Sequence, residues 1–426
     1  MEKVNILLLG SGGREHALLT KLAESERAGK LFVAPGNGGM LQLAEKADVN
    51  MDAPEEVAAW AKGHDIDLVV VGPEAPLVEG VADAVRAAGI ACFGPNASAA
   101  QMEGSKEFAK QVMERAGVPT AHYKSFTEAD ACKAYVNEIN GPCVIKADGL
   151  AAGKGVIVAN SVEEALDGVS QCFDGAFGAA GNTVIVEEML FGPECSLLAL
   201  TDGETVVPLA TSQDHKRAYD GDKGPNTGGM GVYSPVPDFL VSEKDYKTMV
   251  EIMNKVVKQL KYDNNTYSGC LYGGFMLTAE GPKVLEFNAR FGDPETQVVL
   301  PRMKADLVDV FMAIEQGELG NASIEWDDDC AVSVVLASKG YPGKYNTGKV
   351  ICGIDVAEAQ EGITVYHAGT KLSETGEILT AGGRVLDVTA VAPTFEEARK
   401  RAYAAVELID FEGKEFRTDI GAKAMR

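Results

Sequence analysis

The 426-residue chain lacks long apolar runs and paired cysteines. No apolar run approaches the ~18 residues needed to span a bilayer, and the apolar stretch at residues 6–9 is too short for a secretory signal. The eight cysteines include no Cys-x-x-Cys pair and the five histidines are isolated. Neither a zinc site nor a disulfide framework is indicated, so we expect buried thiols in a cytoplasmic protein with no membrane partner.

Positive charge is also scarce. The chain has 39 Lys and Arg residues against 63 Asp and Glu residues, a net charge of −24, which argues against a nucleic-acid partner. An anionic substrate must therefore be held by local positive clusters. The length predicts two to four domains, and an apolar content of 46% is ordinary for an α/β protein.

The segment from residue 143 to 159 places a glycine-rich loop between two apolar strands. Because glycines have no Cβ, their backbone N–H groups can close over phosphate oxygens, and lysines beside them supply positive charge. This pattern predicts a site for a nucleoside triphosphate. Its candidate ligands are Lys146, Gly149, Gly153, Lys154 and Gly155.

Two other interpretations of this loop stay open. A glycine-rich hairpin turn with a solvated lysine has the same composition. A Walker loop fits less well, because three residues rather than four separate Gly149 from Gly153, and glycine rather than Ser or Thr follows Lys154. The loop also joins strand to strand, whereas a Walker loop joins a strand to a helix.

The first hundred residues alternate short apolar strands with helical segments. Strands are predicted at residues 4–9, 31–34 and 68–71, and a helix after the first turn through about residue 28. Each strand runs into a loop rich in glycine or proline. The alternation predicts a small doubly wound parallel sheet that binds ligands at its carboxyl edge.

The turn after the first strand has part of a dinucleotide-binding pattern. Gly10-x-Gly12 opens a helix, but Glu15 stands where the third small residue belongs, and its carboxylate would repel a pyrophosphate. A nicotinamide-dependent oxidoreductase is therefore an alternative that NAD(P) binding would test.

A helix is predicted from Ser105 to Ala116, ended by Gly117. Lys106 lies in its first turn, where a cation opposes the helix dipole. A ligand anion would explain this lysine, and an exposed lysine tolerated at small cost is the alternative. Further along, the strand near residues 184–190 offers backbone and apolar groups to an adenine edge, and Glu194 could bind ribose hydroxyls.

The segment from residue 283 to 295 carries a polar face. In a strand, Glu286, Asn288 and Arg290 share one side, while Leu285 and Phe287 pack on the other. Carboxylate and amide oxygens are hard ligands suited to Mg²⁺ bridging phosphates. The alternative is a solvent-exposed hairpin.

Arg290 and Asp293 follow the metal-ligating pattern. Arg290 can hold a carboxylate or phosphate through a bidentate pair. Asp293 followed by Pro294 predicts a helix N-cap with proline at the first helical position, and that helix start could face an anion.

Five short motifs together resemble the ATP-grasp superfamily. They are Lys106, Val144-Ile-Lys146, Gly149-Leu-Ala-Ala-Gly-Lys-Gly155, Glu187-Glu188 and Glu286-Phe-Asn288. Longer strings, which span most of the chain, resemble the phosphoribosylamine–glycine ligase family. These are Gly12-Gly-Arg-Glu-His-Ala-Leu18, Val71-Gly-Pro-Glu-Ala-Pro-Leu77, Ser212-Gln-Asp-His-Lys-Arg217, Gly224-Pro-Asn-Thr-Gly-Gly-Met-Gly231 and Arg290-Phe-Gly-Asp-Pro-Glu-Thr296.

The resemblance implies a multidomain α/β and α+β protein. Residues 1–102 would form an N-terminal α/β domain with the doubly wound parallel sheet, and residues 103–120 with 191–326 an ATP-grasp core. Residues 121–190 would form a mobile lid, and 327–426 a small C-terminal α+β domain. The resemblance also implies a monofunctional chain, without the fused downstream synthetase and transformylase of some animal relatives.

The activity implied by the resemblance is ATP-dependent ligation of glycine to 5-phosphoribosylamine in purine biosynthesis. ATP and Mg²⁺ or Mn²⁺ would convert glycine to glycyl phosphate, and attack by the amine would give glycinamide ribonucleotide, ADP and phosphate. A monomer is expected, with a homodimer as the alternative. Two other functions stay open: another ATP-grasp carboxylate–amine or carboxylate–thiol ligase, and a non-catalytic nucleotide-binding regulator.

The resemblance also implies roles for individual residues. Lys106 and Lys146 would contact the nucleotide, Glu194 its ribose, and Glu286 and Asn288 the metal. Adenine would be framed by Glu187, Glu188, Met189 and Leu190. Arg290 would face the acyl group, with Asp214 and Lys216 as further catalytic candidates. The remaining substrate candidates are Gly12, Gly13, Arg14, Glu15, Glu74, Asn226 and Thr227.

Overall fold

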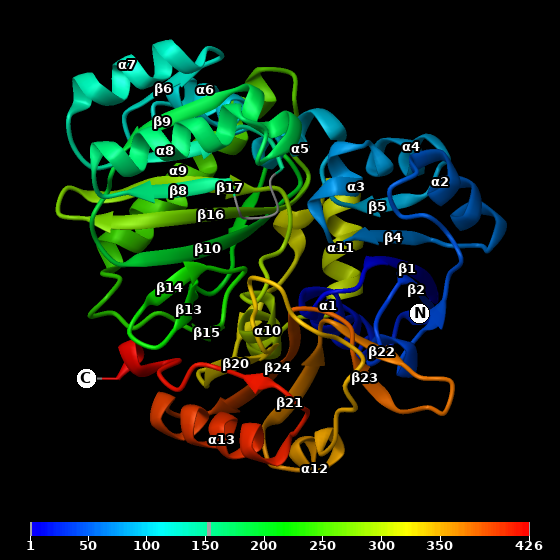
Figure 1. Cartoon of the computed structure of the whole chain (residues 1–426). Coiled ribbons are helices and arrows are strands. Elements are labelled where there is room, and N and C mark those ends of the chain that lie inside the picture. Colours follow the sequence, from blue (N-terminus) through cyan, green and yellow to red (C-terminus); the bar gives the residue numbers. More distant parts are fainter. Residues whose placement is uncertain (1, 151–154, 426) are drawn as a thin grey trace.

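The computed structural model describes residues 2–150 and 155–425 (Figure 1). At the N-terminus, a five-stranded parallel sheet has the order β3-β2-β1-β4-β5. Its strands are β1 (Val4–Gly10), β2 (Ala28–Pro35), β3 (Glu45–Lys46), β4 (Leu68–Val71) and β5 (Ala91–Phe93). The strand order reverses at β1, so the predicted doubly wound parallel sheet is confirmed.

Five helices accompany this sheet: α1 (Gly13–Ala23), α2 (Pro54–Gly63), α3 (Glu74–Val78), α4 (Val81–Ala87) and α5 (Ala97–Gly104). The prediction that the first helix continues to about residue 28 is wrong. It ends at Ala23, and Ala28 already pairs with Val4 of β1. Sheet pairing therefore decides the conformation of the residues just after the helix.

The central part is built on an antiparallel sheet with the order β11-β10-β16-β17. Its strands are β10 (Glu194–Thr201), β11 (Val206–Pro208), β16 (Gly269–Thr278) and β17 (Gly281–Asn288), with α9 (Glu243–Tyr262) and α6 (Lys106–Ala116) packed nearby. The hydroxyl of Ser105 accepts a hydrogen bond from Phe108 N, and Gly117 ends α6 in the left-handed region. The predicted helix and its end at Ala116 are confirmed, while its first residue is Lys106 and Ser105 is the cap.

Residues 123–188 form an α/β unit above the central sheet (Figure 1). Its antiparallel sheet has the order β6-β9-β7-β8, and two helices pack together on it. The elements are β6 (Tyr123–Phe126), α7 (Ala129–Ile139), β7 (Cys143–Ala147), β8 (Val156–Ala159), α8 (Val162–Phe173) and β9 (Val184–Glu188). This unit has a separate hydrophobic cluster that includes Val136, Ile145 and Val169.

A sheet near the C-terminus joins strands that are distant in the sequence. Its order is β12-β15-β20-β24-β21, and β25 also pairs with β20. These strands are β12 (Gln213–Asp214), β15 (Gly231–Ser234), β20 (Cys330–Ser338), β21 (Ile363–His367), β24 (Arg384–Ala392) and β25 (Lys414–Glu415). The sheet thus fixes the segment that begins at Asp214, one of the candidate catalytic residues, to the C-terminal strands.

The described residues also form three strand pairs, four further α-helices and five short 3-10 helices. The strand pairs and α-helices are the hairpin β13 (Arg217–Tyr219) and β14 (Lys223–Asn226), the pair β18 (Met303–Lys304) and β19 (Glu325–Trp326), the pair β22 (Thr370–Leu372) and β23 (Ile378–Thr380), and the helices α10 (Thr296–Val299), α11 (Leu307–Glu315), α12 (Ile354–Glu358) and α13 (Phe395–Leu408).

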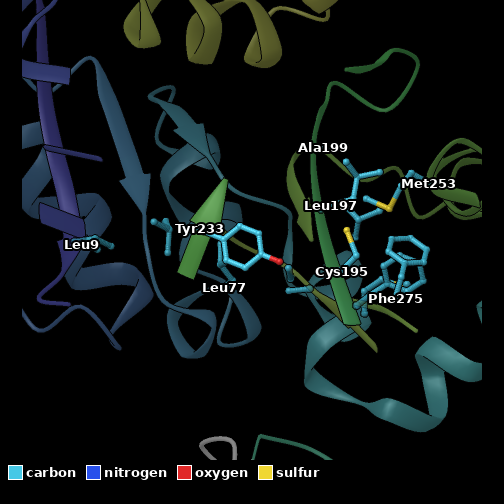
Figure 2. Packing of buried hydrophobic residues seen from close by; sticks show 14 of the residues in the cluster. Leu9, Leu77, Cys195, Leu197, Ala199, Tyr233, Met253 and Phe275 are labelled. Atoms are coloured by element: carbon cyan, nitrogen blue, oxygen red, sulfur yellow. The ribbon is translucent and has the colours of Figure 1, made fainter. Parts of the chain in front are cut away.

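One hydrophobic cluster extends through the N-terminal, central and C-terminal parts. Figure 2 shows Leu9 from the N-terminal sheet and Leu77 from α3, together with Cys195 and Phe275 from the central sheet. Continuous burial of this kind favours fixed relative positions of the parts that carry the site.

The thiols are mostly buried. Six of the eight cysteines are buried, Cys330 is half-buried, and Cys352 is exposed, so the expectation of buried thiols is wrong for Cys352. Among the described residues, no helix is long and apolar enough to cross a membrane.

Candidate active site

Glu286 on β17 lies among four positively charged side chains. Burial alone would raise the pKa of this carboxyl, but Lys216, Lys146, Lys106 and Arg290 together lower it. These cations come from four parts of the fold: α6, the unit at residues 123–188, the segment after β12, and the segment just beyond β17. The fold therefore brings together five residues that the sequence singled out.

The strand that carries Glu286 has an irregular register. Gly274 pairs with Glu286, but Phe275 pairs with Val284, so Leu285 has no partner across the ladder. Phe287 is buried as predicted, whereas the prediction that Leu285 packs beside it is wrong, because Leu285 is half-buried at this irregularity. The Leu285 carbonyl instead accepts a hydrogen bond from Lys146 Nζ at 3.1 Å.

Asp148 occupies the N-terminus of α6. Its carboxylate accepts hydrogen bonds from the Ser105 hydroxyl at 3.1 Å and from Glu107 N at 3.1 Å. Lys106 Nζ donates to the Gly149 carbonyl at 2.9 Å. Burial lowers the pKa of Lys106, and Lys146 acts in the same direction. The protein's own carboxylate thus complements the helix dipole, while the Lys106 ammonium faces the glycine loop.

Arg290 lies just beyond the end of β17 and is fixed by two carboxylates. Its Nη2 donates to Glu103 at 2.7 Å, and its Nε lies 3.4 Å from Glu74. Nη2 also lies 3.4 Å from Asn288 Oδ1, so both residues lie at the same end of the strand. Glu103, on α5, further accepts a hydrogen bond from Ala289 N at 2.7 Å.

A second group of carboxylates lies beside Lys216. The Lys216 ammonium is 3.1 Å from Asp214. Burial alone would lower the pKa of Lys216, but Asp214, Glu194 and Glu286 help to hold it well above its usual range. Burial and then Asp214 raise the pKa of Glu295. The predicted ribose ligand Glu194 therefore faces two candidate catalytic residues.

Glu295 is held by a buried chain of hydroxyl groups. The Tyr272 hydroxyl donates to Glu295 at 2.8 Å and lies 2.8 Å from the Ser196 hydroxyl. Sequence reasoning missed Glu295, Tyr272, Ser196 and Glu103 as members of this site. The sequence offers no local signal for Glu103, since its partners Arg290 and Ala289 are distant along the chain.

The predicted N-terminal substrate residues form their own network. The Glu15 carboxylate accepts a hydrogen bond from Gly12 N at 2.6 Å and also pairs with the Arg14 guanidinium. Arg14 Nη1 donates to the Phe291 carbonyl at 3.2 Å. Burial alone would raise the pKa of Glu74, but Arg290 and Arg14 together lower it. Arg14 and Glu74 therefore adjoin the Arg290 end of the site.

Gly13 lies where α1, α10 and β24 meet. A Cβ at Gly13 would lie 2.3 Å from Asp387 Oδ2 and 2.6 Å from Gln297 Nε2. Burial and then Asp293 raise the pKa of Asp387 to about 7. The close approach of these segments requires glycine at position 13.

The prediction that Asp293 caps the following helix is wrong. The helix α10 begins at Thr296, with Glu295 at the cap position. The Asp293 carboxylate instead accepts hydrogen bonds from Arg14 N at 3.4 Å and Gln297 Nε2 at 3.0 Å, and pairs with Arg384 at 3.3 Å. Long-range partners thus determine its orientation.

The segment at residues 214–231 is not one open loop, because it contains the β13–β14 hairpin. The Thr227 hydroxyl donates to the Lys216 carbonyl at 2.9 Å, and Thr227 N donates to the same carbonyl at 2.7 Å. Asn226 is exposed on β14. The hairpin therefore supports the Lys216 backbone.

The predicted adenine segment includes the end of β9. Glu187 is buried and pairs with Lys146 at 2.9 Å, whereas Glu188 accepts a hydrogen bond from His122 N at 3.1 Å. Met189 and Leu190 follow the strand and are half-buried. In the glycine loop, Gly149 has a φ of +92° and the Gly155 carbonyl accepts from Ala147 N at 2.8 Å. Gly153 and Lys154 lie outside the described residues.

The donor set suits Mg²⁺ or Mn²⁺ shared with phosphates. Within residues 2–150 and 155–425, no group of three or more His, Cys, Asp or Glu side chains forms a metal cage. Glu286 and Asn288 offer one carboxylate and one amide oxygen on the same strand. Few protein ligands beside bound phosphates are typical of Mg²⁺ in phosphoryl-transfer enzymes.

Three family models match successive parts of the chain. They are the phosphoribosylglycinamide synthetase N domain at residues 4–103, the ATP-grasp (A) domain at 104–296 and the C domain at 331–423. Phosphoribosylamine–glycine ligase from Brucella melitensis is 49% identical over 422 residues, 99% of this chain and 98% of the relative. The chain belongs to the phosphoribosylamine–glycine ligase family.

Other family members agree in length and fold. The ligase from Yersinia pestis is 50% identical over 426 residues and 99% of each chain. The crystal structure of the phosphoribosylamine–glycine ligase from Thermotoga maritima is 32% identical, has a TM-score of 0.83, and matches 98% of this chain and 100% of that chain. The family is one of ATP-dependent ligases, and the predicted ATP-grasp fold is confirmed.

The fold is also shared outside the family. The biotin carboxylase domain of Hydrogenobacter thermophilus 2-oxoglutarate carboxylase, solved with MgADP and bicarbonate, has a TM-score of 0.75 at 19% identity. The match extends over 97% of this chain and 92% of that chain. At this identity, the likeness concerns the fold alone.

Proposed function

We propose that the protein joins glycine to 5-phosphoribosylamine through glycyl phosphate, with ATP as the phosphoryl donor. The products are glycinamide ribonucleotide, ADP and phosphate. Family membership over nearly the whole chain supports the reaction. The observation that carries the mechanism is the position of Glu286 among Lys106, Lys146, Lys216 and Arg290.

Phosphoryl transfer onto a carboxylate requires neutralisation of several negative charges. We assign Lys106 and Lys146 to the phosphates of ATP, since both reach the Glu286 region from beside the glycine loop. Glu286 and Asn288 would hold Mg²⁺ or Mn²⁺. When bound, the metal supplies charge neutralisation across the transferring phosphate.

Arg290 is our candidate for holding the glycine carboxylate. Glu103 and Glu74 fix its guanidinium at 2.7 Å and 3.4 Å, which limits the orientations available to a bound anion. Asp214 and Lys216 adjoin the same region and would contact the substrates near the reacting amine. Alignment of the substrates and stabilisation of the transferring charge accelerate this reaction, so no nucleophilic side chain is required.

The remaining assignments concern the adenine, the ribose and the phosphoribosylamine. We propose that Glu187 to Leu190 frame adenine, that Glu194 contacts the ribose, and that the N-terminal residues from Gly12 to Glu15 line the phosphoribosylamine side. Arg14 and Glu74 support the last proposal because both adjoin Arg290.

The proposed activity is tested by ADP release. With MgATP present, ADP should form rapidly only when both glycine and freshly prepared phosphoribosylamine are added. Assays in which another acid replaces glycine, or another amine replaces phosphoribosylamine, should give little ADP, which distinguishes this activity from that of another carboxylate–amine ligase. Equal ADP release with a different acid or amine would contradict the substrate assignment.

We further propose a cytoplasmic monomer. Light scattering coupled to size-exclusion chromatography should give a mass near the 45.0 kDa of one chain. A mass twice as large would establish the homodimer instead.

A further inference from the structure

Two buried lysines share the Glu187 carboxylate. Lys110 Nζ lies 3.1 Å from Glu187 Oε1, and Lys146 Nζ lies 2.9 Å from Glu187 Oε2. The Lys110 side chain is 2% exposed, that of Lys146 8% and that of Glu187 3%. The cluster therefore holds two lysine side chains and one glutamate side chain away from bulk water.

The cluster connects the α/β unit at residues 123–188 to the central sheet. Lys146 donates to the Leu285 carbonyl at 3.1 Å. Lys110 donates to the Thr120 hydroxyl at 2.8 Å, and this hydroxyl donates to the Val284 carbonyl at 2.7 Å. Both lysines are thus tied, directly or through Thr120, to consecutive carbonyls just before Glu286.

These contacts leave one N–H donor of the Lys146 ammonium unused. An ammonium group has three N–H donors, and two of those on Lys146 are directed at Glu187 and Leu285. The third is available to a phosphate oxygen. Because Glu187 is shared with Lys110, its single negative charge cannot neutralise both lysines.

Charged and titratable groups face Lys110 from three strands. Glu187 and Glu188 lie on β9, Lys146 on β7, and the Tyr123 ring on β6 with its centroid 5.3 Å from Lys110 Nζ. Burial lowers the pKa of Lys110 to about 8, Lys146 adds to this effect, and Glu187 opposes it. A phosphate brought to Lys146 would add negative charge near Lys110 and favour the protonated form of Lys110.

We propose that Lys110 is a positioning residue for the nucleotide: it shares Glu187 so that Lys146 keeps positive charge for an ATP phosphate, and it takes up a proton when ATP binds. The proposal rests on the ATP assignment made above. Lys110 acts through Glu187 and Lys146, without contact to the nucleotide. The proton comes from the buffer, and no covalent bond forms or breaks.

Titration calorimetry with MgATP and no glycine tests the proposal, because binding then occurs without ligation. The binding enthalpy is measured in Tris and in HEPES, whose ionisation enthalpies differ. The wild-type protein should take up protons on binding at pH 8, and fewer at pH 6.5, where more of the Lys110 side chains already carry the proton. Equal enthalpies in the two buffers at pH 8 would overturn the proposal.

Substitutions at position 110 separate charge from titration. Lys110→Arg keeps a permanent positive charge, so MgATP should bind without proton uptake. In Lys110→Met, the Glu187 carboxylate pairs with Lys146 alone and neutralises its charge. The apparent KM for MgATP should then rise about tenfold, because less positive charge is available to the phosphate. The exposed Lys255→Met on α9 is the matched control and should keep wild-type uptake and affinity.

The possible outcomes are distinct. If proton uptake persists in Lys110→Arg, Lys110 is not the group that takes up the proton, and the proposal is overturned. This result decides the question even if Lys110→Met fails to fold. If the wild-type protein binds MgATP without uptake, this inference fails while the ATP assignment stands. If it shows no MgATP binding at all, the ATP assignment fails and the inference with it.

Discussion

Arg290 Nη2 donates a hydrogen bond to the Glu103 carboxylate at 2.7 Å, which connects the end of β17 to α5. The same carboxylate accepts from Ala289 N at 2.7 Å. Glu103 therefore fixes both the Arg290 side chain and the backbone that carries it. An arginine held in this way presents its remaining donors to a substrate anion in one orientation.

Replacement of Glu103 by Gln should weaken this orientation. We expect kcat to fall by about tenfold while KM for MgATP changes little, because Arg290 is assigned to the acyl side. Steady-state kinetics with each substrate varied separately measures the effect. The control Glu251→Gln removes only an exposed ion pair and should leave the kinetics unchanged. A selective rise in KM for MgATP would contradict the assignment of Arg290.

Replacement of Glu286 by Gln keeps the side-chain volume but removes a negative metal ligand. Turnover should fall by roughly 10²-fold or more while the fold is retained, and the requirement for Mg²⁺ should increase. Turnover measured across a Mg²⁺ titration, with circular dichroism as the test of folding, checks this. Near-wild-type turnover at subsaturating Mg²⁺ would refute the metal assignment.

Gly13→Ala should disturb the junction of α1 with Asp387 and Gln297. The new methyl group would lie within 2.3 Å and 2.6 Å of their side chains, so the free energy of unfolding should fall. We expect a loss of about 1–3 kcal/mol, measured by urea denaturation. Asp387→Gly should reduce this loss when the two changes are combined, because it removes the nearer contact.

A matched control exists for the Gly13 substitution. Gly63 lies at the end of α2, and a Cβ there meets no atom within 4 Å. Gly63→Ala should therefore leave stability unchanged or slightly increased. An equal loss of stability in both variants would show that close approach at Gly13 is not the cause.

Two buried histidines should make stability depend on pH. Burial lowers the pKa of His16 to about 3 and that of His367 to about 4, and His16 Nδ1 accepts a hydrogen bond from His367 N at 2.7 Å. In the unfolded chain, the two imidazoles bind protons as the pH falls through about 6.5. In the folded protein, they stay neutral at that pH. Their contribution to stability is full above pH 6.5 and is lost as the pH falls toward 4.

The slope of this pH dependence can be measured. Each histidine should contribute roughly 1.4 kcal/mol per pH unit to the unfolding free energy between its two pKa values. Urea denaturation at several pH values from 7 to 4.5 should show the decrease, with a smaller slope in His16→Gln. His64→Gln, at an exposed position, is the control. An unchanged slope in His16→Gln would refute this explanation.

Local patterns were sufficient to predict the parallel sheet, the helix α6 with its end at Ala116, and the polar end of β17. These features depend on periodicity, helix caps and turn residues, which nearby residues determine. The positions of Glu286 and Asn288 on one strand followed from alternation alone, although Leu285 did not pack as alternation predicts. The irregular register at Leu285 arises from pairing with β16, which the local pattern does not contain.

The partners of the candidate residues could not be predicted in the same way. Arg290 meets Glu103, and Asp293 meets Arg14 and Arg384, across large separations in the sequence. Such contacts depend on how the N-terminal, central and C-terminal parts pack together. The N-cap pattern at Asp293 was therefore misleading. Its carboxylate contacts Arg14 and Arg384, and the helix starts only at Thr296.

Isotope transfer from glycine tests the central claim most directly. Glycine with ¹⁸O in its carboxylate, MgATP and phosphoribosylamine are incubated with the protein, and the released phosphate is examined by mass spectrometry. If glycine is activated as glycyl phosphate, one carboxylate oxygen leaves with the phosphate when the amine attacks, so the phosphate should carry a single ¹⁸O. Formation of glycinamide ribonucleotide together with unlabelled phosphate would contradict the acyl-phosphate mechanism.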